Sequence, residues 1–122
     1  MHYDYERRCR DVEKFLSNFY VKVKIFGIRF RDDRDKNRNT LLDLEISPHL
    51  REKVVMSLKW NDYSEGPITD ELNNYGEMWV FGKDVNGTEV YIKISMGPPN
   101  SNTICISFHT AEHPMSYPLK NN

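Results

Sequence analysis

The sequence predicts an α+β fold in which helices pack on one face of a mostly antiparallel sheet. Apolar residues recur at helical spacing near the N-terminus, whereas in the last third of the chain they alternate with polar residues, which is the strand period. The dipeptide Asn86-Gly87, which favours a two-residue hairpin turn, separates two of the alternating segments. The chain has 122 residues, 39% hydrophobic and 29% charged, so we expect one domain over residues 1–122.

An amphipathic helix and a strand are expected at the start of the chain. Over residues 5–19 apolar side chains repeat every three or four positions, and this pattern follows Asp4, a favourable N-cap. From residue 20 to residue 31 apolar and basic residues alternate, which predicts a strand. The alternation changes phase at Ile25-Phe26, where Gly27 permits a bulge.

Two short helices and a long loop are expected next. The polar run 32–39 should form a loop that leads into a helix over 40–44. A second helix should begin at Ser47-Pro48, because Ser is a good N-cap and Pro fits the first helical turn. The segment from Trp60 to Gly76 contains Gly66-Pro67 and several Asn and Asp residues, which predicts a loop.

The last third of the chain predicts a three-strand antiparallel meander. Its strands should run from Met78 to Lys83, from Glu89 to Met96 and from Thr103 to His109. The order is therefore helix, strand, two short helices and three strands, which completes the α+β prediction. After the last strand, residues 111–122 should form an extended C-terminal tail that packs along the domain beside His109, since prolines interrupt regular structure there.

One face of this meander should stay open. The helices need an apolar sheet face, and the last two strands offer Val90, Ile92, Ile94, Met96, Ile104, Ile106 and Phe108 for it. The intervening residues should then pair on the other face: Tyr91 with His109, Lys93 with Ser107, and Ser95 with Cys105. With Gly82 beside Tyr91, this arrangement predicts an uncovered concavity lined by Tyr91, Lys93 and His109.

Charge is unevenly distributed along the chain. The net charge of −1 excludes a uniformly basic nucleic-acid binder. Residues 22–38, however, hold seven basic and three acidic residues, a local charge of +4, whereas residues 61–77 hold five acidic residues and neither Lys nor Arg. The basic segment, with Arg29 and Arg31, is a candidate phosphate-binding surface, as is Lys83; the alternative is a strand edge made soluble by charge.

Several other classes of protein are disfavoured by the sequence. No apolar run approaches the length of a membrane span and the N-terminal residues have no signal-peptide core, so we expect a cytoplasmic protein without membrane association. Cys9 and Cys105 lie far apart, which suggests neither a disulfide nor a zinc site. A metal pair of His109 and His113 is disfavoured by Pro114, and no cofactor-binding motif is present, so no metal or cofactor is expected.

The predicted concavity has the residue types that RNA cleavage without a metal needs. That reaction requires a base for the 2′-hydroxyl proton, an acid for the leaving oxygen and a cation near the phosphate. His109 is the candidate acid or base, because histidine titrates near neutral pH, and Lys93 or an arginine is the candidate cation. Tyr91 offers a hydrogen bond or a stacking surface. The competing interpretation is the ordinary solvated face of a half-buried sheet.

Several strand motifs, taken with the order of elements, also resemble a known family. They are Val54-Val55-Met56-Ser57-Leu58 before Asp62-Tyr63, then Met78-Trp79, Glu89-Val90-Tyr91-Ile92-Lys93-Ile94, and Ile104-Cys105-Ile106-Ser107-Phe108-His109. In these motifs the chain resembles the MqsR-like toxins of bacterial toxin–antitoxin systems, within the RelE-like ribonuclease group. The resemblance is close in the second half of the chain and limited to element order in the first half.

The resemblance implies a RelE-like fold, metal-independent cleavage of mRNA, free or on the ribosome, and neutralisation by a cognate antitoxin. Tyr91 matches a family tyrosine at the catalytic face, and His109 stands where the family has a lysine after Ser-Phe. Tyr63 or its neighbour matches the region of another catalytic lysine, where this chain has Ser64-Glu65, and Tyr63 is therefore a candidate RNA contact. Val80 stands where the family has a polar residue after Trp.

A non-catalytic function is the alternative. The same sheet face, or the acidic segment 61–77, would then dock a partner protein, either as an interaction module or as an inactive relative of the toxins. Trp60, Tyr63 and Tyr75, if exposed, would suit such an interface, since aromatic residues are enriched at protein interfaces.

Overall fold

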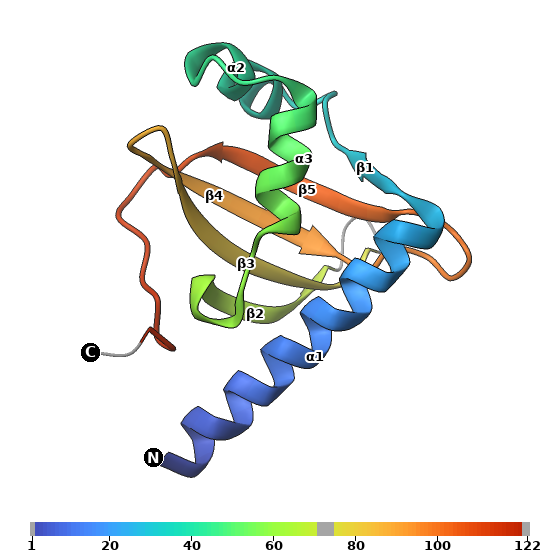
Figure 1. Ribbon diagram of the computed structural model, residues 1–122, viewed down its shortest axis with the longest axis vertical. Helices are drawn as coiled ribbons and strands as arrows, with labels where there is room; N and C mark the ends of the chain where they lie inside the picture. The colour runs from blue at the N-terminus through green and yellow to red at the C-terminus, as the bar shows by residue number, and fades with distance from the viewer. Residues whose placement is uncertain (1, 71–74, 121–122) are drawn as a thin grey trace.

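The computed structural model describes residues 2–70 and 75–120 and has an α+β architecture (Figure 1). Its elements are α1 (His2–Phe26), β1 (Ile28–Phe30), α2 (Asp35–Asp43), α3 (Pro48–Met56), a single 3-10 turn (Trp60–Asp62), β2 (Tyr63–Asp70), β3 (Gly76–Val85), β4 (Thr88–Ser95) and β5 (Thr103–Thr110). The strands form one sheet in the order β1-β5-β4-β3-β2, and β2 to β5 are an antiparallel meander.

The first helix is longer than the sequence predicts. Residues 20–26 continue α1 instead of forming a strand, because Val23 stays on the buried side of the helix, one turn after Phe19. The other two apolar residues of the alternating segment, Val21 and Ile25, point to solvent and are 57% and 67% exposed. Apolar and basic residues alternating over a few positions fit either period, so the pattern alone misassigned this segment.

Gly27 ends α1 rather than forming a bulge. It has a φ of +80°, the left-handed conformation that glycine adopts most readily, and its N–H donates to the Val23 carbonyl. What remains of the predicted strand is β1, which pairs parallel with β5, Ile28 opposite Thr103. The sheet is therefore mixed, and β1 forms one of its two edges.

The two short helices are present, one of them displaced. The predicted second helix begins as expected, with the Ser47 Oγ accepting from the Leu50 N–H at 3.0 Å and Pro48 in the first turn. The helix expected over 40–44 instead starts at Asp35, inside the polar run. The loop before it is anchored by Arg51, whose buried guanidinium pairs with the Asp32 carboxylate (2.6 and 3.0 Å).

The segment predicted as the loop 60–76 contains the strand β2, and its residues 71–74 lie outside the described part of the chain. β2 pairs with β3 at the edge of the sheet, with two register shifts, at Tyr63/Glu65 and Glu65/Ile68. An edge strand tolerates the glycine, the proline and the polar residues that made this sequence look like a loop. The aromatic residues predicted to be exposed here are not: Tyr63 is buried, and Trp60 and Tyr75 are partly buried.

The hairpin of β3 and β4 follows the prediction. Asn86 and Gly87 both have positive φ (53° and 84°), as a type I′ turn requires, and Val85 pairs with Thr88. The register places Gly82 opposite Tyr91, as predicted.

β5 departs from strict alternation at a bulge. Lys93 pairs with Ser107 while Ile94 pairs with Cys105, so Ile106 is an additional residue in β5. The predicted pair of Ser95 and Cys105 is therefore wrong, and Ser95 lies opposite Ile104. The bulge also reverses the faces of the first half of β5.

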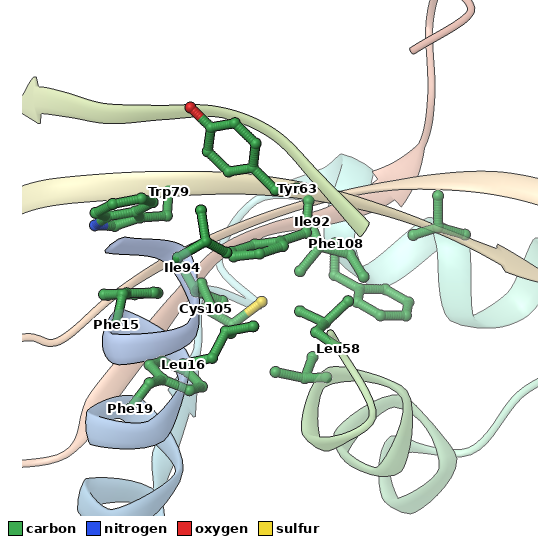
Figure 2. Close-up of a cluster of buried hydrophobic side chains, with 14 of the residues drawn as sticks. Phe15, Leu16, Phe19, Leu58, Tyr63, Trp79, Ile92, Ile94, Cys105 and Phe108 are labelled. Carbon is green, nitrogen blue, oxygen red and sulfur yellow. The ribbon is translucent and has the colours of Figure 1, made fainter. Parts of the chain in front are cut away.

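Because of this reversal, Cys105 joins the main core, in which Phe15 of α1 stacks on Trp79 of β3 at a centroid distance of 4.8 Å (Figure 2). That core lies between the sheet and the helices α1 and α3, which cover one of its faces (Figure 1). Ile104 and Ile106, predicted to face the helices, instead pack with Met78 in a small cluster on the other face, which we call the open face.

Candidate functional site

A polar cleft of about 400 Å³ lies on the open face of β4 and β5, beside the start of α2. It is lined by Arg34, Asp35, Lys36, Asn37, Tyr91, Lys93, Ser107, His109 and Glu112. The three residues that the sequence analysis placed together, Tyr91, Lys93 and His109, all line it. We call it the β4/β5 cleft.

Strand pairing positions the floor of the β4/β5 cleft. Tyr91 lies directly opposite His109, and their rings stack with centroids 5.1 Å apart and planes inclined by 13°. One step along the strands, Lys93 lies opposite Ser107. Because residues at alternate positions of a strand share a face, these four side chains project from the same side of the sheet.

Arg34 is a cleft residue that the sequence analysis did not single out. Its Nη1 donates to the Ile106 carbonyl at 3.1 Å and to the Ser107 Oγ at 3.3 Å, so the guanidinium lies over the bulge of β5. The excess of basic residues over 22–38 includes Arg34, but nothing in the sequence distinguishes it from the other bases of that segment.

The Asn37 side chain, which is 2% exposed, attaches α2 to β5. Its Nδ2 donates to the carbonyls of Arg31 (2.8 Å) and Ile106 (3.0 Å), and its Oδ1 accepts the Phe108 N–H at 3.0 Å. The Asn37 amide thus forms hydrogen bonds with backbone groups of β5 that would otherwise pair with β1 if that strand were longer. This attachment holds the first turn of α2, and with it Arg34, against the cleft.

The charges around the cleft affect its titratable groups. Burial and the neighbouring Arg34 lower the pKa of Lys93, and the carboxylates of Asp70 and Glu65 partly oppose this shift. Burial raises the pKa of Tyr91, and Glu65 raises it further. Lys93 makes no hydrogen bond or ion pair with any residue in the described part of the chain, so its ammonium is available to a ligand.

The predicted phosphate contacts on β1 do not line the β4/β5 cleft. Arg29 is exposed beside Ile104 on the open face. Arg31 is bound on both sides: its guanidinium donates to the Asp33 carboxylate at 2.8 and 2.7 Å and lies over the Tyr75 ring, 5.6 Å from the centroid. Through Tyr75, Arg31 therefore packs against the small apolar cluster of the open face and not in the cleft.

Two other predicted contacts lie on the opposite side of the sheet. Tyr63 is 5% exposed and packs edge-on against Phe81 in the core, with its hydroxyl donating to the Gly66 carbonyl. Lys83 pairs with Asp62 at 3.0 Å. Neither side chain reaches the open face, so Tyr63 and Lys83, predicted as RNA contacts, lie apart from the β4/β5 cleft.

The C-terminal tail borders one end of the β4/β5 cleft. Glu112 pairs with Lys36 at 2.5 Å, across the rim of the cleft beside His109. Further on, the Tyr117 hydroxyl donates to Glu89 at 2.6 Å, and its ring occupies the space that a side chain at Gly82 would fill. The tail therefore covers the neighbouring part of the open face and leaves the β4/β5 cleft uncovered.

Within residues 2–70 and 75–120, no group of three or more His, Cys, Asp or Glu is arranged to hold a metal ion, and no helix has the length and apolar character to cross a membrane. Comparison of the chain with protein-family models, with curated proteins and with solved structures finds no match.

Proposed function

We propose that this protein is a metal-independent endoribonuclease that cleaves RNA in the β4/β5 cleft. The observation that carries the proposal is the convergence of one histidine, one tyrosine and two cationic side chains, His109, Tyr91, Lys93 and Arg34, in a single open cleft. A phosphodiester carries one negative charge, and cations held in a partly buried site stabilise the additional charge that develops as it reacts.

Each residue has a distinct task in this mechanism. His109 transfers a proton to or from a reacting oxygen, because an imidazole ring can both donate and accept a proton. Lys93 and Arg34 hold the phosphate oxygens, and the partial burial of Lys93 strengthens this contact because less water competes for it. The stacked pair of Tyr91 and His109 presents an aromatic surface on which an unpaired base can stack.

Within this function, the biological class we propose is that of the MqsR-like toxins: a cytoplasmic enzyme that cleaves mRNA and is neutralised by an antitoxin protein. The strand motifs that contain Tyr91 and His109 support this class. The departures from the family pattern, histidine in place of lysine at position 109 and Ser64-Glu65 in place of a lysine region, imply that the protons are transferred by different side chains here.

The test is cleavage of single-stranded RNA by the purified protein in the presence of EDTA. We expect products with a 2′,3′-cyclic phosphate and a 5′-hydroxyl, and we expect His109→Ala to lower kcat by about 10²- to 10⁴-fold, the usual contribution of a proton-transfer group. Wild-type protein that leaves RNA intact, or a His109→Ala variant that cleaves at the wild-type rate, would refute the proposal.

A further inference from the structure

Lys93 offers an unoccupied amine in the β4/β5 cleft. The residue is partly buried, yet its Nζ makes no hydrogen bond or ion pair within residues 2–70 and 75–120. Partial burial of a charge opposes folding, and contacts with carboxylates or carbonyls usually offset that cost. Lys93 has no such contact in the described part of the chain, so its nitrogen stays accessible from the cleft.

Arg34 brings a second cation to the same place. Its Nη1 donates to the Ser107 Oγ at 3.3 Å, and Ser107 is directly opposite Lys93 in the sheet. Side chains that are directly opposite in neighbouring strands lie close enough to interact. The guanidinium of Arg34 and the amine of Lys93 therefore converge on one residue of β5, and both line the cleft. We call Arg34 and Lys93 the cation pair.

The two carboxylates that line the cleft are engaged by other cations. Asp35 pairs with Arg38, and Glu112 pairs with Lys36 at 2.5 Å. Neither makes an ion pair with the cation pair in the described chain. Two neighbouring cations without a contacting carboxylate favour a small ligand that carries a phosphate group.

Lys22 shows what distinguishes Lys93 from another partly buried lysine. The Lys22 Nζ donates to the carbonyls of Met96 and Pro98, at 2.5 and 2.6 Å, and these contacts stabilise its protonated form. Burial lowers the pKa of both amines, and Arg34 lowers that of Lys93 further. A lysine becomes a better nucleophile when desolvation and a neighbouring cation favour its neutral form. Lys93 meets both conditions, and its nitrogen is unoccupied as well.

We propose that Lys93 is a modification site at which small acyl phosphates acylate the side-chain amine. The phosphate of the reagent binds Arg34, which places the acyl carbon beside Lys93. The Lys93 ammonium gives a proton to water, and the neutral Nζ forms a bond to the acyl carbon. The bond between that carbon and the bridging phosphate oxygen breaks, and inorganic phosphate leaves with the electron pair and with a second nitrogen proton. The product is Nε-acyl-lysine.

The modification regulates the cleft. The amide that forms is neutral, so acylation removes one of the two charges that hold a phosphate there. RNA cleavage should therefore fall as Lys93 is acylated. This consequence rests on the proposed function, whereas the acylation itself does not.

The first experiment locates the lysines that acetyl phosphate modifies in the folded protein at neutral pH. Peptide mass spectrometry after short incubations gives the rate at each lysine. We expect Lys93 to react at least about fivefold faster than Lys14, which is exposed on α1, because a desolvated amine beside a cation is activated. Lys22 should react more slowly than Lys93, and inorganic phosphate should protect Lys93 but not Lys14.

A second reagent and two variants test the role of the phosphate group. The N-hydroxysuccinimide ester of acetic acid is neutral, so its preference for Lys93 over Lys14 should be smaller than that of acetyl phosphate. Arg34→Gln should reduce the preference of acetyl phosphate for Lys93. Arg29→Gln is the matched control, because it makes the same change of charge at an exposed position outside the cleft, and it should leave that preference unchanged. Thermal melting checks that the variants fold alike.

The regulatory consequence is measured on the same samples. The rate of RNA cleavage should fall in proportion to the acetylated fraction of Lys93. Protein that is acetylated in the presence of inorganic phosphate and then freed of it should retain its activity. A loss of activity that follows the acetylation of another lysine would contradict the regulatory role of Lys93.

The outcomes separate this site from the proposed function. If Lys93 reacts no faster than Lys14, or if both reagents prefer it equally, the modification site is wrong, and cleavage of RNA by the untreated protein still upholds the proposed function. If acetyl phosphate selects Lys93 but the untreated protein leaves RNA intact, the modification site stands and the proposed function fails.

Discussion

The two faces of strands β3 to β5 are built from alternate residues of the same segments, yet they have opposite properties. The covered face contributes side chains such as Phe81 and Ile92, both 0% exposed, to a core of stacked aromatic rings. The open face contributes Tyr91, Lys93 and His109, which remain partly accessible. Burial of apolar surface stabilises a fold, whereas partial burial of a charge opposes folding. The comparison indicates that the fold's stability resides on one face and the candidate chemistry on the other.

The largest effect should come from the covered face. Phe81→Ala removes a ring that is 0% exposed, with neighbours Phe15 and Tyr63 at centroid distances of 6.4 and 6.3 Å. We expect the free energy of unfolding to fall by about 3–5 kcal/mol, the usual cost of a cavity of this size, as measured by urea denaturation. Phe26→Ala, at an exposed position, is the control and should change it by no more than about 0.5 kcal/mol. Equal losses in the two variants would contradict the division between the faces.

The sequence predicted the covered face better than the edges of the fold. The helix over 5–19, the turn at Asn86-Gly87 and the antiparallel strands of the last third follow from local sequence patterns, and burial alternates along most of β4 as those patterns predict. Local periodicity fails in residues 20–26, where the same short pattern fits both the helical and the strand period. It also fails in the edge strand β2, which contains polar residues and pairs with a neighbouring strand on one side only.

The candidate site was also predicted only in part, because only part of it follows from local sequence patterns. The pairing of Tyr91 with His109 follows from strand alternation and a turn of defined length, so the sequence contains it. Arg34 comes to the cleft through a contact between distant segments, the hydrogen bonds of the Asn37 amide with β5. The Ile106 carbonyl at the bulge accepts hydrogen bonds from Arg34 and Asn37, and because strand alternation does not predict this bulge, the faces of the first half of β5 were predicted wrongly.

An intermediate effect should come from Asn37, which joins α2 to the edge of the sheet. Asn37→Ala removes three hydrogen bonds and leaves the buried Phe108 N–H without its acceptor, whereas the Ile106 carbonyl keeps Arg34 as a donor. We expect the free energy of unfolding to fall by about 1–3 kcal/mol, measured by urea denaturation. Hydrogen exchange at the Phe108 amide should also accelerate.

The neighbouring Asn39 provides the control, because it is exposed on the same helix. Asn39→Ala should leave both the stability and the exchange rate of the Phe108 amide close to those of the wild type. If Asn37→Ala behaves like Asn39→Ala, the side chain does not hold α2 against β5, and the position of Arg34 has another cause.

The smallest effect should come from the open face, and it should have the opposite sign. Burial and Arg34 lower the pKa of Lys93, so the folded protein releases this proton at lower pH than the unfolded chain does. Folding must therefore partly remove the charge of protonated Lys93 from water. Lys93→Met abolishes that cost and should raise the free energy of unfolding at pH 7 by no more than about 1 kcal/mol.

The dependence on pH distinguishes this cause from better packing of the methionine. As the pH approaches the ordinary lysine pKa of 10.5, the wild type gains stability because its folded state loses the Lys93 proton first, so the advantage of Lys93→Met should shrink. A constant advantage would indicate packing, and a loss of stability at pH 7 would contradict the desolvation of Lys93. Lys14→Met, on exposed α1 surface, should show neither effect. If Lys93→Met is more stable but cleaves RNA more slowly, the open face retains a charge that function needs and folding opposes.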